Sequence, residues 1–468
     1  MLRNISQFSV LMMASLVFSQ SLAFAGSGPQ PRTGNSAAST FGATNFEPSN
    51  LTSFMQNARV FLGTQPINPV DHPTFGLVVT RGDESPQPTP TSTPTGVDVS
   101  QPIYINIAVG TEAEAWFEKA YASMVNAKLN KLQDGRTFFV NIEGKGSISA
   151  AQAIVEAERS RVQGKSPGTH YTVWCPAASV YKSLVTDHFR SSPFLSEDPL
   201  VNSPVVFVTF DKSQEVITNK YPLVGTGMSL LTIGQIVAGE LKQGAGIIKP
   251  NGQNFKFGTT DPAQSSTGAI LLMMAANEYF ETQYHGRAFD KSALSDPNFQ
   301  GFLALIKGNT QNNVASTETL SSDMSASIAT VDSGFMYESS AINVIKTLQK
   351  RGKKHVSVRY PKFNFLTDHP YYILATGTTS GEQLAARVFM DYLKSDAMQK
   401  MAAVDFNFRP LNPVVDEDTQ DDLFKRFAAF GIWPTEKLSD LMLMEPPRRD
   451  FIEAITDIYK GVSFQNIF

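Results

Sequence analysis

The chain has 468 residues, of which 42% are hydrophobic and 18% charged, and this is the composition of a globular protein with enough apolar material for a large core. Its formal charge of −4 is a mild acidic excess, which gives no electrostatic footprint for nucleic acid or for an anionic membrane surface. Cys175 is the only cysteine, so the fold has no internal disulfide and depends on its core for stability.

The N-terminus has the pattern of a secretory signal peptide. Arg3 is followed by an uncharged, largely apolar stretch and then by the A-x-A site Ala23-Phe24-Ala25. A membrane anchor is the alternative, but serines and glutamines interrupt the stretch, whereas a span needs ~20 consecutive apolar residues. We therefore predict a signal peptide over residues 1–25 and a periplasmic location for the mature chain.

Residues 26–101 are predicted to form a low-complexity stalk. Small and polar residues dominate its first part, which cannot bury enough apolar surface to offset the entropy of ordering. Residues 45–84 carry scattered apolar side chains that either dock on the main domain or fold marginally. Residues 85–102 alternate Pro and Thr, which favours polyproline II and a semi-rigid spacer.

Strand and helix patterns begin to alternate at Ile103. β-rich runs at 103–109, 137–142 and 171–175 are each followed by a turn and a helical pattern. The first of these helices is predicted to begin at Thr111, which forms a capping box with Glu114. Three successive strand–turn–helix units predict a parallel, doubly wound α/β sheet.

A second lobe is predicted to begin at the apolar run 204–210. Further along the chain, Ser265 or Ser266 caps an apolar helix, a strand ends at Met336, and a helix starts at Glu338. A strand over 371–375 is followed by a strongly amphipathic helix, for which Ser380 and Gln383 are predicted to form the capping box.

Small and hydroxylated residues fill the turns that follow these strands. In doubly wound sheets, ligands bind beyond the carboxyl ends of the strands, where helix N-termini offer N–H groups and a positive dipole end. The turns are Gly110-Thr111-Glu112, residues 144–147, residues 177–179 and residues 261–268. Any one hydroxyl alone is better explained as a helix cap, but their recurrence favours a polar ligand. An anion suits helix N-termini best, although any carbonyl or hydroxyl acceptor would also fit.

Five short segments carry a resemblance to a known family. They are Val173 to Ser179 (VWCPAAS), Gly258 to Pro262 followed by Ser265 to Gly268, Phe335 to Ser339 (FMYES), Asp368 to Tyr371 (DHPY), and Phe408 to Pro410 (FRP). In order and spacing they resemble the bacterial extracellular solute-binding proteins of the type II periplasmic-binding fold, in the branch related to ABC-transporter binding proteins for oxyanions. The resemblance covers about residues 102–467.

This resemblance implies two α/β lobes joined by crossing strands, with a ligand cleft between them. Residues 102–203 would form the first part of lobe 1, residues 204–370 lobe 2, and residues 371–468 the return to lobe 1 with the C-terminal helices. The sequence departs from the family pattern at Thr111, where paired serines are common, and at Cys175, where serine is usual.

Ten residues are predicted to bind the ligand. The resemblance implies that Thr111, the turn around residues 261–267 and the segment that starts at Tyr337 face the cleft; the strand-end argument adds Glu112, Ser147 and Ser179. Glu338 accepts hydrogen bonds from a ligand or binds a cation, or else it is a helix N-terminal carboxylate favoured by the dipole. The full set is Thr111, Glu112, Ser147, Ser179, Asp261, Ser265, Ser266, Thr267, Tyr337 and Glu338.

No motif for a metal, a cofactor or catalysis emerges. The Gly144-Lys145-Gly146-Ser147 turn lacks the spacing of a nucleotide-binding P-loop, and the D-x-S-x-S match at Asp323 lacks the apolar strand that an adhesion-type metal site needs. No cysteine–histidine cluster has zinc spacing. Cys175 is either a nucleophile at a strand end or, more in keeping with free cysteines in general, a buried inert thiol.

Three functions are therefore compared. The first is an exported, non-enzymatic binding protein that captures a small polar solute and delivers it to an inner-membrane permease or envelope protein. The second is an interaction module of the cell envelope that kept the fold and lost the solute, and the third is an enzyme that uses Cys175. We favour them in that order.

Overall fold

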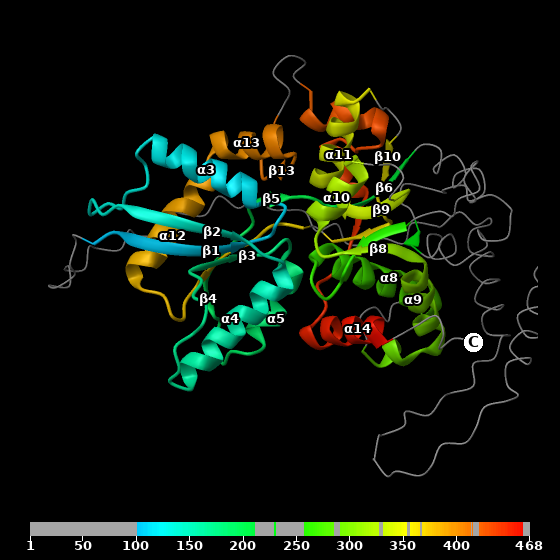
Figure 1. The fold of residues 1–468 in the computed structure, drawn as a ribbon, viewed down its shortest axis with the longest axis horizontal. Helices are drawn as coiled ribbons and strands as arrows, with labels where there is room; N and C mark the ends of the chain where they lie inside the picture. Colours follow the sequence, from blue (N-terminus) through cyan, green and yellow to red (C-terminus); the bar gives the residue numbers. More distant parts are fainter. Residues whose placement is uncertain are drawn as a thin grey trace, which may run out of the picture. The chain divides into compact units, whose positions relative to one another are not determined.

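The structure is a computed structural model that describes residues 101–210, 229–230, 257–284, 291–326, 331–352, 356–365, 367–412, 414 and 421–461. The predicted signal peptide, and all but the last residue of the predicted stalk, lie outside the described residues. Within them the chain forms two α/β lobes, each built on a five-stranded sheet (Figure 1).

The first lobe confirms the predicted parallel, doubly wound sheet. Its strands lie in the order β2-β1-β3-β12-β4, with β1 parallel to both β2 and β3 and with β12 antiparallel to β3 and β4. Their bounds are β1 (Ile103–Val109), β2 (Phe138–Gly144), β3 (Val173–Cys175), β4 (Phe194–Asp198) and β12 (Tyr371–Leu374). Helices α3 (Glu114–Asn126) and α12 (Ser380–Leu393) pack on one face, and α4 (Ser147–Val162) packs on the other.

The second lobe has the strand order β10-β6-β9-β7-β8. Strand β7 is parallel to β8 and β9, whereas β6 is antiparallel to β9 and β10. The strands are β6 (Val205–Phe210), β7 (Phe257–Thr260), β8 (Thr310–Val314), β9 (Ser333–Tyr337) and β10 (Val356–Arg359). The long helices are α8 (Ser266–Tyr284), α9 (Pro297–Asn309), α10 (Thr317–Ala326) and α11 (Glu338–Lys350).

The C-terminal region contributes to both lobes. Helix α12 and the following α13 (Asp396–Phe406) belong to the first lobe, whereas α14 (Arg449–Gly461), red in Figure 1, packs against α8 and α9 of the second. The short elements are η1 (Ser179–Tyr181), α5 (Ser183–Thr186), β5 (Val201–Asn202), η2 (Lys291–Ser295), β11 (Phe363–Asn364), β13 (Arg409–Pro410), η3 (Leu423–Phe430), η4 (Thr435–Asp440) and β14 (Met442–Leu443).

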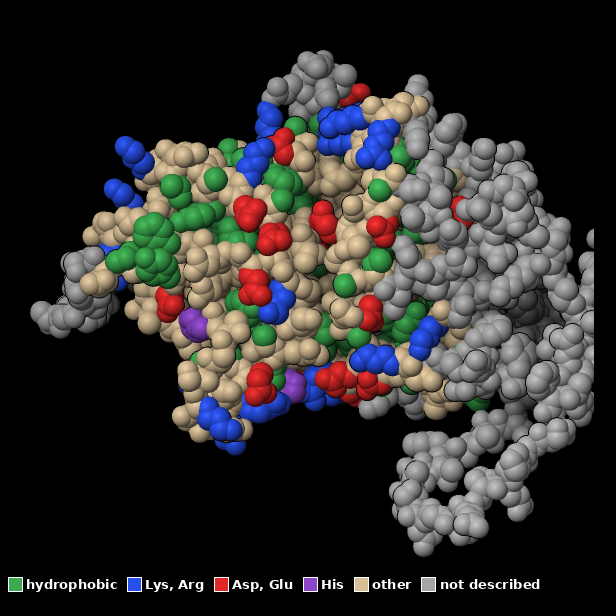
Figure 2. Space-filling view, in the orientation of Figure 1, with side chains coloured by type: hydrophobic (Ala, Val, Ile, Leu, Met, Phe, Trp, Pro, Cys, Tyr) green, Lys and Arg blue, Asp and Glu red, His purple; other side chains and the backbone are tan. Residues whose placement is uncertain are grey.

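A stacked aromatic pair lies on the outer face of β1 and β2. Tyr104 and Phe139 are directly opposite each other in the register, their ring centroids are 5.3 Å apart, and both are exposed. Figure 2 shows green side chains gathered over this end of the first lobe. Cross-strand aromatic pairs of this kind stabilise the pairing of an edge strand such as β2.

Two predicted capping boxes differ from the structure. Helix α3 starts at Glu114 after Ala113, so the box between Thr111 and Glu114 is wrong. The Glu114 carboxylate instead accepts a hydrogen bond from the backbone N–H of Gly144 at 2.8 Å, which satisfies the end of β2. On α12 the box is formed one residue earlier than predicted, by Thr379 and Glu382.

The segments that cross between the lobes are held by buried hydrogen bonds. The Ser203 N–H donates to the Thr367 carbonyl at 3.0 Å, and the Thr367 hydroxyl donates back to the Ser203 carbonyl. The Asn364 side chain accepts from the N–H of Val205 at 3.2 Å and donates to its carbonyl at 2.8 Å. Because buried backbone groups are costly to leave unpaired, these bonds fix the crossing point.

A buried ion pair also joins the lobes at this crossing. Arg409, which follows α13 of the first lobe, forms a two-pronged pair with Glu338, the first residue of α11 in the second lobe, at 2.6 and 2.7 Å. The Tyr360 hydroxyl donates to Glu338, and Arg409 donates to the Trp433 carbonyl. Burial acts to lower the pKa of Arg409, but the charge and hydrogen bonds of Glu338 outweigh it and hold the pKa above its ordinary value.

Removing one partner of this pair should destabilise the fold strongly. We expect Arg409→Met to lower the free energy of unfolding by about 3–5 kcal/mol, because Glu338 would become an uncompensated buried charge. The matched control is Lys119→Met, which breaks the exposed pair with Asp405 and should cost less than about 1 kcal/mol. Urea unfolding measures both changes, and a similar loss in the two variants would contradict the argument.

Candidate ligand-binding cleft

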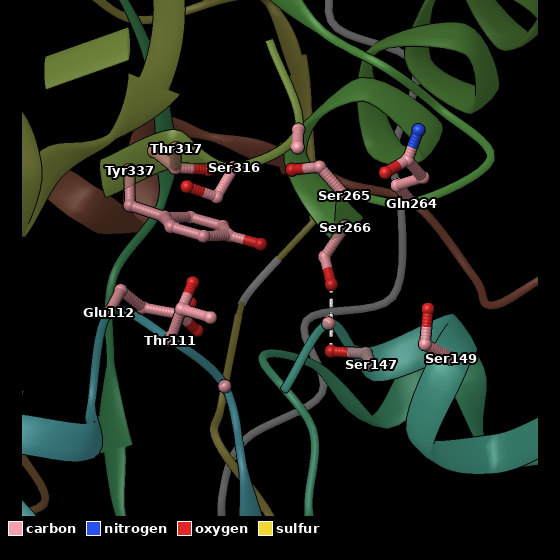
Figure 3. A pocket seen from close by; sticks show the side chains of 13 residues that line it. Thr111, Glu112, Ser147, Ser149, Gln264, Ser265, Ser266, Ser316, Thr317 and Tyr337 are labelled. Carbon is pink, nitrogen blue, oxygen red and sulfur yellow. Dashed lines mark hydrogen bonds between the residues drawn. The ribbon is translucent and has the colours of Figure 1, made fainter. Parts of the chain in front are cut away.

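A pocket of about 140 Å³ lies between the two lobes, and Figure 3 shows the side chains that line it. Its walls come from turns far apart in the sequence. The first lobe contributes Gly110, Thr111, Glu112, Gly146, Ser147 and Ser149, and the second contributes Gln264, Ser265, Ser266, Ala315, Ser316, Thr317 and Tyr337. Most of these side chains are small and carry a hydroxyl.

The strand directions explain why these turns meet. The lining residues follow the carboxyl ends of β1, β2, β7, β8 and β9, and all of these strands end at the cleft. The N-termini of α4, α8 and α10 therefore converge on the pocket with Ser147, Ser266 and Thr317 as their first residues. Their first N–H groups lack partners within the helix, and each helix presents its positive dipole end.

The two lobes touch along one side of the pocket. The Ser266 hydroxyl donates to the Ser147 hydroxyl at 2.7 Å, drawn as the dashed line in Figure 3, and the Tyr181 hydroxyl donates to the Ser266 carbonyl at 2.7 Å. Ser147 also accepts a hydrogen bond from the N–H of Ala177 at 3.0 Å. Gly146 is so close to Gln264 that a Cβ atom on Gly146 would lie 2.4 Å from the Gln264 carbonyl oxygen. The contact thus depends on a residue without a side chain.

Tyr337 provides a hydroxyl without a hydrogen-bond partner. Its side chain is 1% exposed and points into the pocket, with Thr111 on the opposite wall (Figure 3). Thr267 and Ser266 lie nearby, but neither has the geometry to bond to it. Burial, followed by the charge of Glu112, raises the pKa of Tyr337 well above its ordinary value, so the hydroxyl is a neutral donor. A buried, unpartnered donor in a pocket is typical of a binding site.

Glu112 is the one charged residue among the described residues that line the pocket. Its Oε1 atom lies 3.1 Å from Nε2 of His369, a fully buried residue on the crossing segment that leads into β12. Nearby, Glu318 at the start of α10 has a raised pKa, because of burial first and then the charges of Glu112 and Glu114.

Six of the ten predicted ligand-binding residues line the pocket together. They are Thr111, Glu112, Ser147, Ser265, Ser266 and Tyr337. Among the other four, Ser179 donates its N–H to Asp368 at 2.7 Å, and Asp261 accepts from the N–H of Ala263 within its own turn at 2.9 Å.

The last two of the four are engaged elsewhere. The Thr267 hydroxyl is hydrogen-bonded to the Thr317 hydroxyl beneath the pocket wall. Glu338 is fully buried in the ion pair with Arg409, so the two lone pairs that face Arg409 are already used. Two roles were predicted for Glu338 from the sequence, a ligand contact or a carboxylate at a helix N-terminus. Its place at the first position of α11 agrees with the second role.

Sequence reasoning missed Ser149, Gln264, Ser316 and Thr317. The last two follow β8, and this polar strand has none of the hydrophobic pattern that marks the other strands. The Ser316 hydroxyl accepts the N–H of Thr319 at 3.2 Å, and this cap was a readable signal for a helix start beyond the strand.

Cys175 is a buried thiol. Its Sγ atom donates to the His369 carbonyl at 3.5 Å, and burial, followed by the charges of Glu112 and Asp368, raises its pKa well above the ordinary value. In the part of the chain that the structure describes, no group of three or more His, Cys, Asp or Glu residues could hold a metal ion. The described helices include none with the length and hydropathy needed to span a membrane.

The comparison with protein families identifies the class of this protein. The family model described as bacterial extracellular solute-binding protein matches residues 105–404, which is well over half of the chain. The chain therefore belongs to the bacterial extracellular solute-binding protein family. The comparison with curated proteins found no match.

Solved structures of low sequence identity are similar to this chain. The sulfate-binding protein SubI from Mycobacterium tuberculosis is 15% identical, with a TM-score of 0.42 and coverage of 75% of this chain and 96% of its own. Iron-bound HitA from Pseudomonas aeruginosa is 13% identical, with a TM-score of 0.45 and coverage of 77% of this chain and 100% of its own. A Streptococcus pneumoniae solute-binding protein in complex with the blood group A-trisaccharide is 13% identical, with a TM-score of 0.47 and coverage of 78% of this chain and 97% of its own. The three named ligands are unlike one another and single out none for this chain.

Replacing the tyrosine with the unpartnered hydroxyl should not harm the ligand-free fold. We expect Tyr337→Phe to leave the free energy of unfolding unchanged or to raise it by up to about 1–2 kcal/mol, because a buried, unpaired hydroxyl is removed. The control is Tyr181→Phe, which should cost about 1 kcal/mol, because it removes the buried hydrogen bond from the Tyr181 hydroxyl to the Ser266 carbonyl. Equal losses in urea unfolding would show that the Tyr337 hydroxyl has a partner after all.

Proposed function

We propose that this protein captures a small polar solute in the pocket between its lobes. The observation that carries the proposal is the unpartnered Tyr337 hydroxyl at a point where three helix N-termini and a ring of hydroxyls from both lobes converge. Donors so arranged suit a compact ligand that accepts hydrogen bonds, an anion above all. The pocket has a volume of about 140 Å³, so a small ligand fits it best.

Binding would be coupled to closure of the lobes. The sheet of the first lobe with α3, α4, α12 and α13 would move as lobe 1, and the sheet of the second lobe with α8, α9, α10, α11 and α14 as lobe 2, about the hydrogen-bonded crossing at Ser203 and Thr367. Because the lining residues come from both lobes, a ligand that contacts them all would stabilise the closed arrangement. Thr111, Glu112, Ser147, Ser265, Ser266 and Tyr337 are the ligand-contacting residues in this proposal.

The cellular role follows from the family and from the N-terminal pattern. A signal peptide over residues 1–25 would export the chain to the periplasm, and the loaded protein would deliver its solute to an inner-membrane ABC permease or to an envelope sensor. The protein would act by binding and not as an enzyme, and the buried Cys175 thiol agrees with this.

A ligand panel tests the proposal directly. Thermal unfolding of residues 26–468 is measured with inorganic oxyanions, polyamines, sugars and amino acids; a true ligand at ~100 times its dissociation constant should add about 2.7 kcal/mol of stability. The Ser265→Ala/Ser266→Ala variant, checked by circular dichroism, should lose the effect. A chain that no panel member stabilises, and that instead retains an envelope protein, would support the interaction module and contradict solute capture.

The contact at Gly146 allows a test of closure. The backbone of Gly146, with φ −56° and ψ 135°, suits any residue, so Gly146→Ala should fold normally and yet keep the lobes apart through a clash with Gln264. We expect the dissociation constant of the ligand found above to rise about tenfold or more, as the closed state becomes rare. Gly168→Ala, whose Cβ would meet no neighbour, is the matched control. Equal affinities by calorimetry would rule out closure at this contact.

A further inference from the structure

The hydrogen bonds of His369 determine the net charge of the pair that it forms with Glu112. Its Nδ1 atom lies 3.0 Å from the Thr367 carbonyl oxygen, which can only accept, so Nδ1 carries a hydrogen. Its Nε2 atom lies 3.1 Å from Glu112 Oε1, and a hydrogen bond there requires one proton between the two groups. Whether this proton sits on the imidazole or on the carboxyl, the pair has no net charge.

The surroundings hold both partners in place. The His369 ring is fully buried and lies edge-on to the rings of Tyr337 and Phe408, with centroids 6.2 and 5.0 Å away. The backbone of His369 adopts φ +42°, and its N–H donates to the Ala177 carbonyl at 3.2 Å. The Glu112 carboxylate lies over Gly110, where a Cβ atom would be 2.4 Å from Oε1. His369 is therefore held by its backbone and by its neighbours, and the Glu112 carboxylate reaches it through the space that Gly110 leaves free.

We propose that His369 is a positioning residue that holds Glu112 and neutralises its charge, so that the pocket accepts an anionic ligand. This inference rests on the proposed function. A lone carboxylate in the lining would oppose an anion, and the described lining residues include no Lys or Arg to offset it. Because the Glu112–His369 pair has no net charge, the three helix N-termini and the Tyr337 hydroxyl determine which sign of ligand charge the pocket favours.

The binding experiment uses phosphate, sulfate and molybdate as anionic probes, spermidine as a cation and maltose as a neutral solute, measured by calorimetry on residues 26–468. We expect an oxyanion to bind. Glu112→Gln should not tighten oxyanion binding, because the native pair already has no net charge, whereas removal of an uncompensated carboxylate would make the same variant bind at least about tenfold more tightly. A gain in affinity of tenfold or more would overturn the neutral pair, and this arm does not depend on a variant of buried His369.

A second arm separates charge compensation from a merely structural role. His369→Gln should weaken oxyanion binding by about tenfold or more, because Glu112 is left as an anion. Adding Glu112→Gln should restore most of the loss, which a structural defect at His369 would not permit. If the double variant stays weak while both proteins unfold cooperatively, the role of His369 is refuted and solute capture stands.

Two other outcomes of the binding experiment test the charge of the ligand and the capture of a solute. Binding of spermidine or maltose alone would overturn the anionic class and leave the proposed function intact. If no probe binds and the wider ligand panel also fails, solute capture itself is wrong, and the inference about His369 fails with it.

Discussion

Parallel strands end at the same edge of a sheet, and the cleft of this protein depends on that constraint. In the first lobe β1 and β2 run in parallel, and in the second β7, β8 and β9 do so. The turns that follow these strands therefore gather at one place, although Thr111 and Thr317 are far apart in the sequence. The residues in these turns are small and hydroxylated, so the backbones of the two lobes approach closely. A donor-rich pocket then results from topology together with the choice of Ser, Thr and Gly at strand ends.

Polar groups are treated differently at the crossing segments and in the pocket. At the crossing, Ser203, Thr367 and Asn364 are buried and paired, and Glu338 shares its carboxylate between Arg409 and Tyr360. Such a network allows few alternative arrangements, because breaking any bond leaves a buried polar group unsatisfied. In the pocket, Tyr337 is the one lining residue among those described whose fully buried polar atom has no partner. A rigid crossing next to an unsatisfied donor is what a closing receptor needs.

The sequence predicted the architecture well because parallel α/β units have strong local signals. The alternation at 103–109, 137–142 and 171–175 led to the sheet of the first lobe, and the strand-end rule together with the family resemblance led to six pocket residues. Prediction from the sequence failed where side chains form hydrogen bonds to residues distant in the chain. Glu114 was predicted to cap its own helix, but its carboxylate accepts a hydrogen bond from the N–H of Gly144 instead. Ser316 and Thr317 were missed because β8 is polar, and the pairing of His369 with Glu112 spans a separation in sequence that no local pattern reveals.

The contact between Ser147 and Ser266 bears on how the lobes respond to a ligand. A neutral hydrogen bond contributes only about 0.5–1.5 kcal/mol, and the Tyr181 bond adds a similar amount, so these two bonds alone favour closure by little. A factor of ten in population corresponds to about 1.4 kcal/mol, so open and closed states held by such bonds remain within reach of each other. A ligand needs only a modest preference for the closed pocket to shift the balance. The two hydrogen bonds at the pocket therefore do not hold the cleft shut by themselves, and a ligand that bonds to both lobes adds directly to the preference for the closed state.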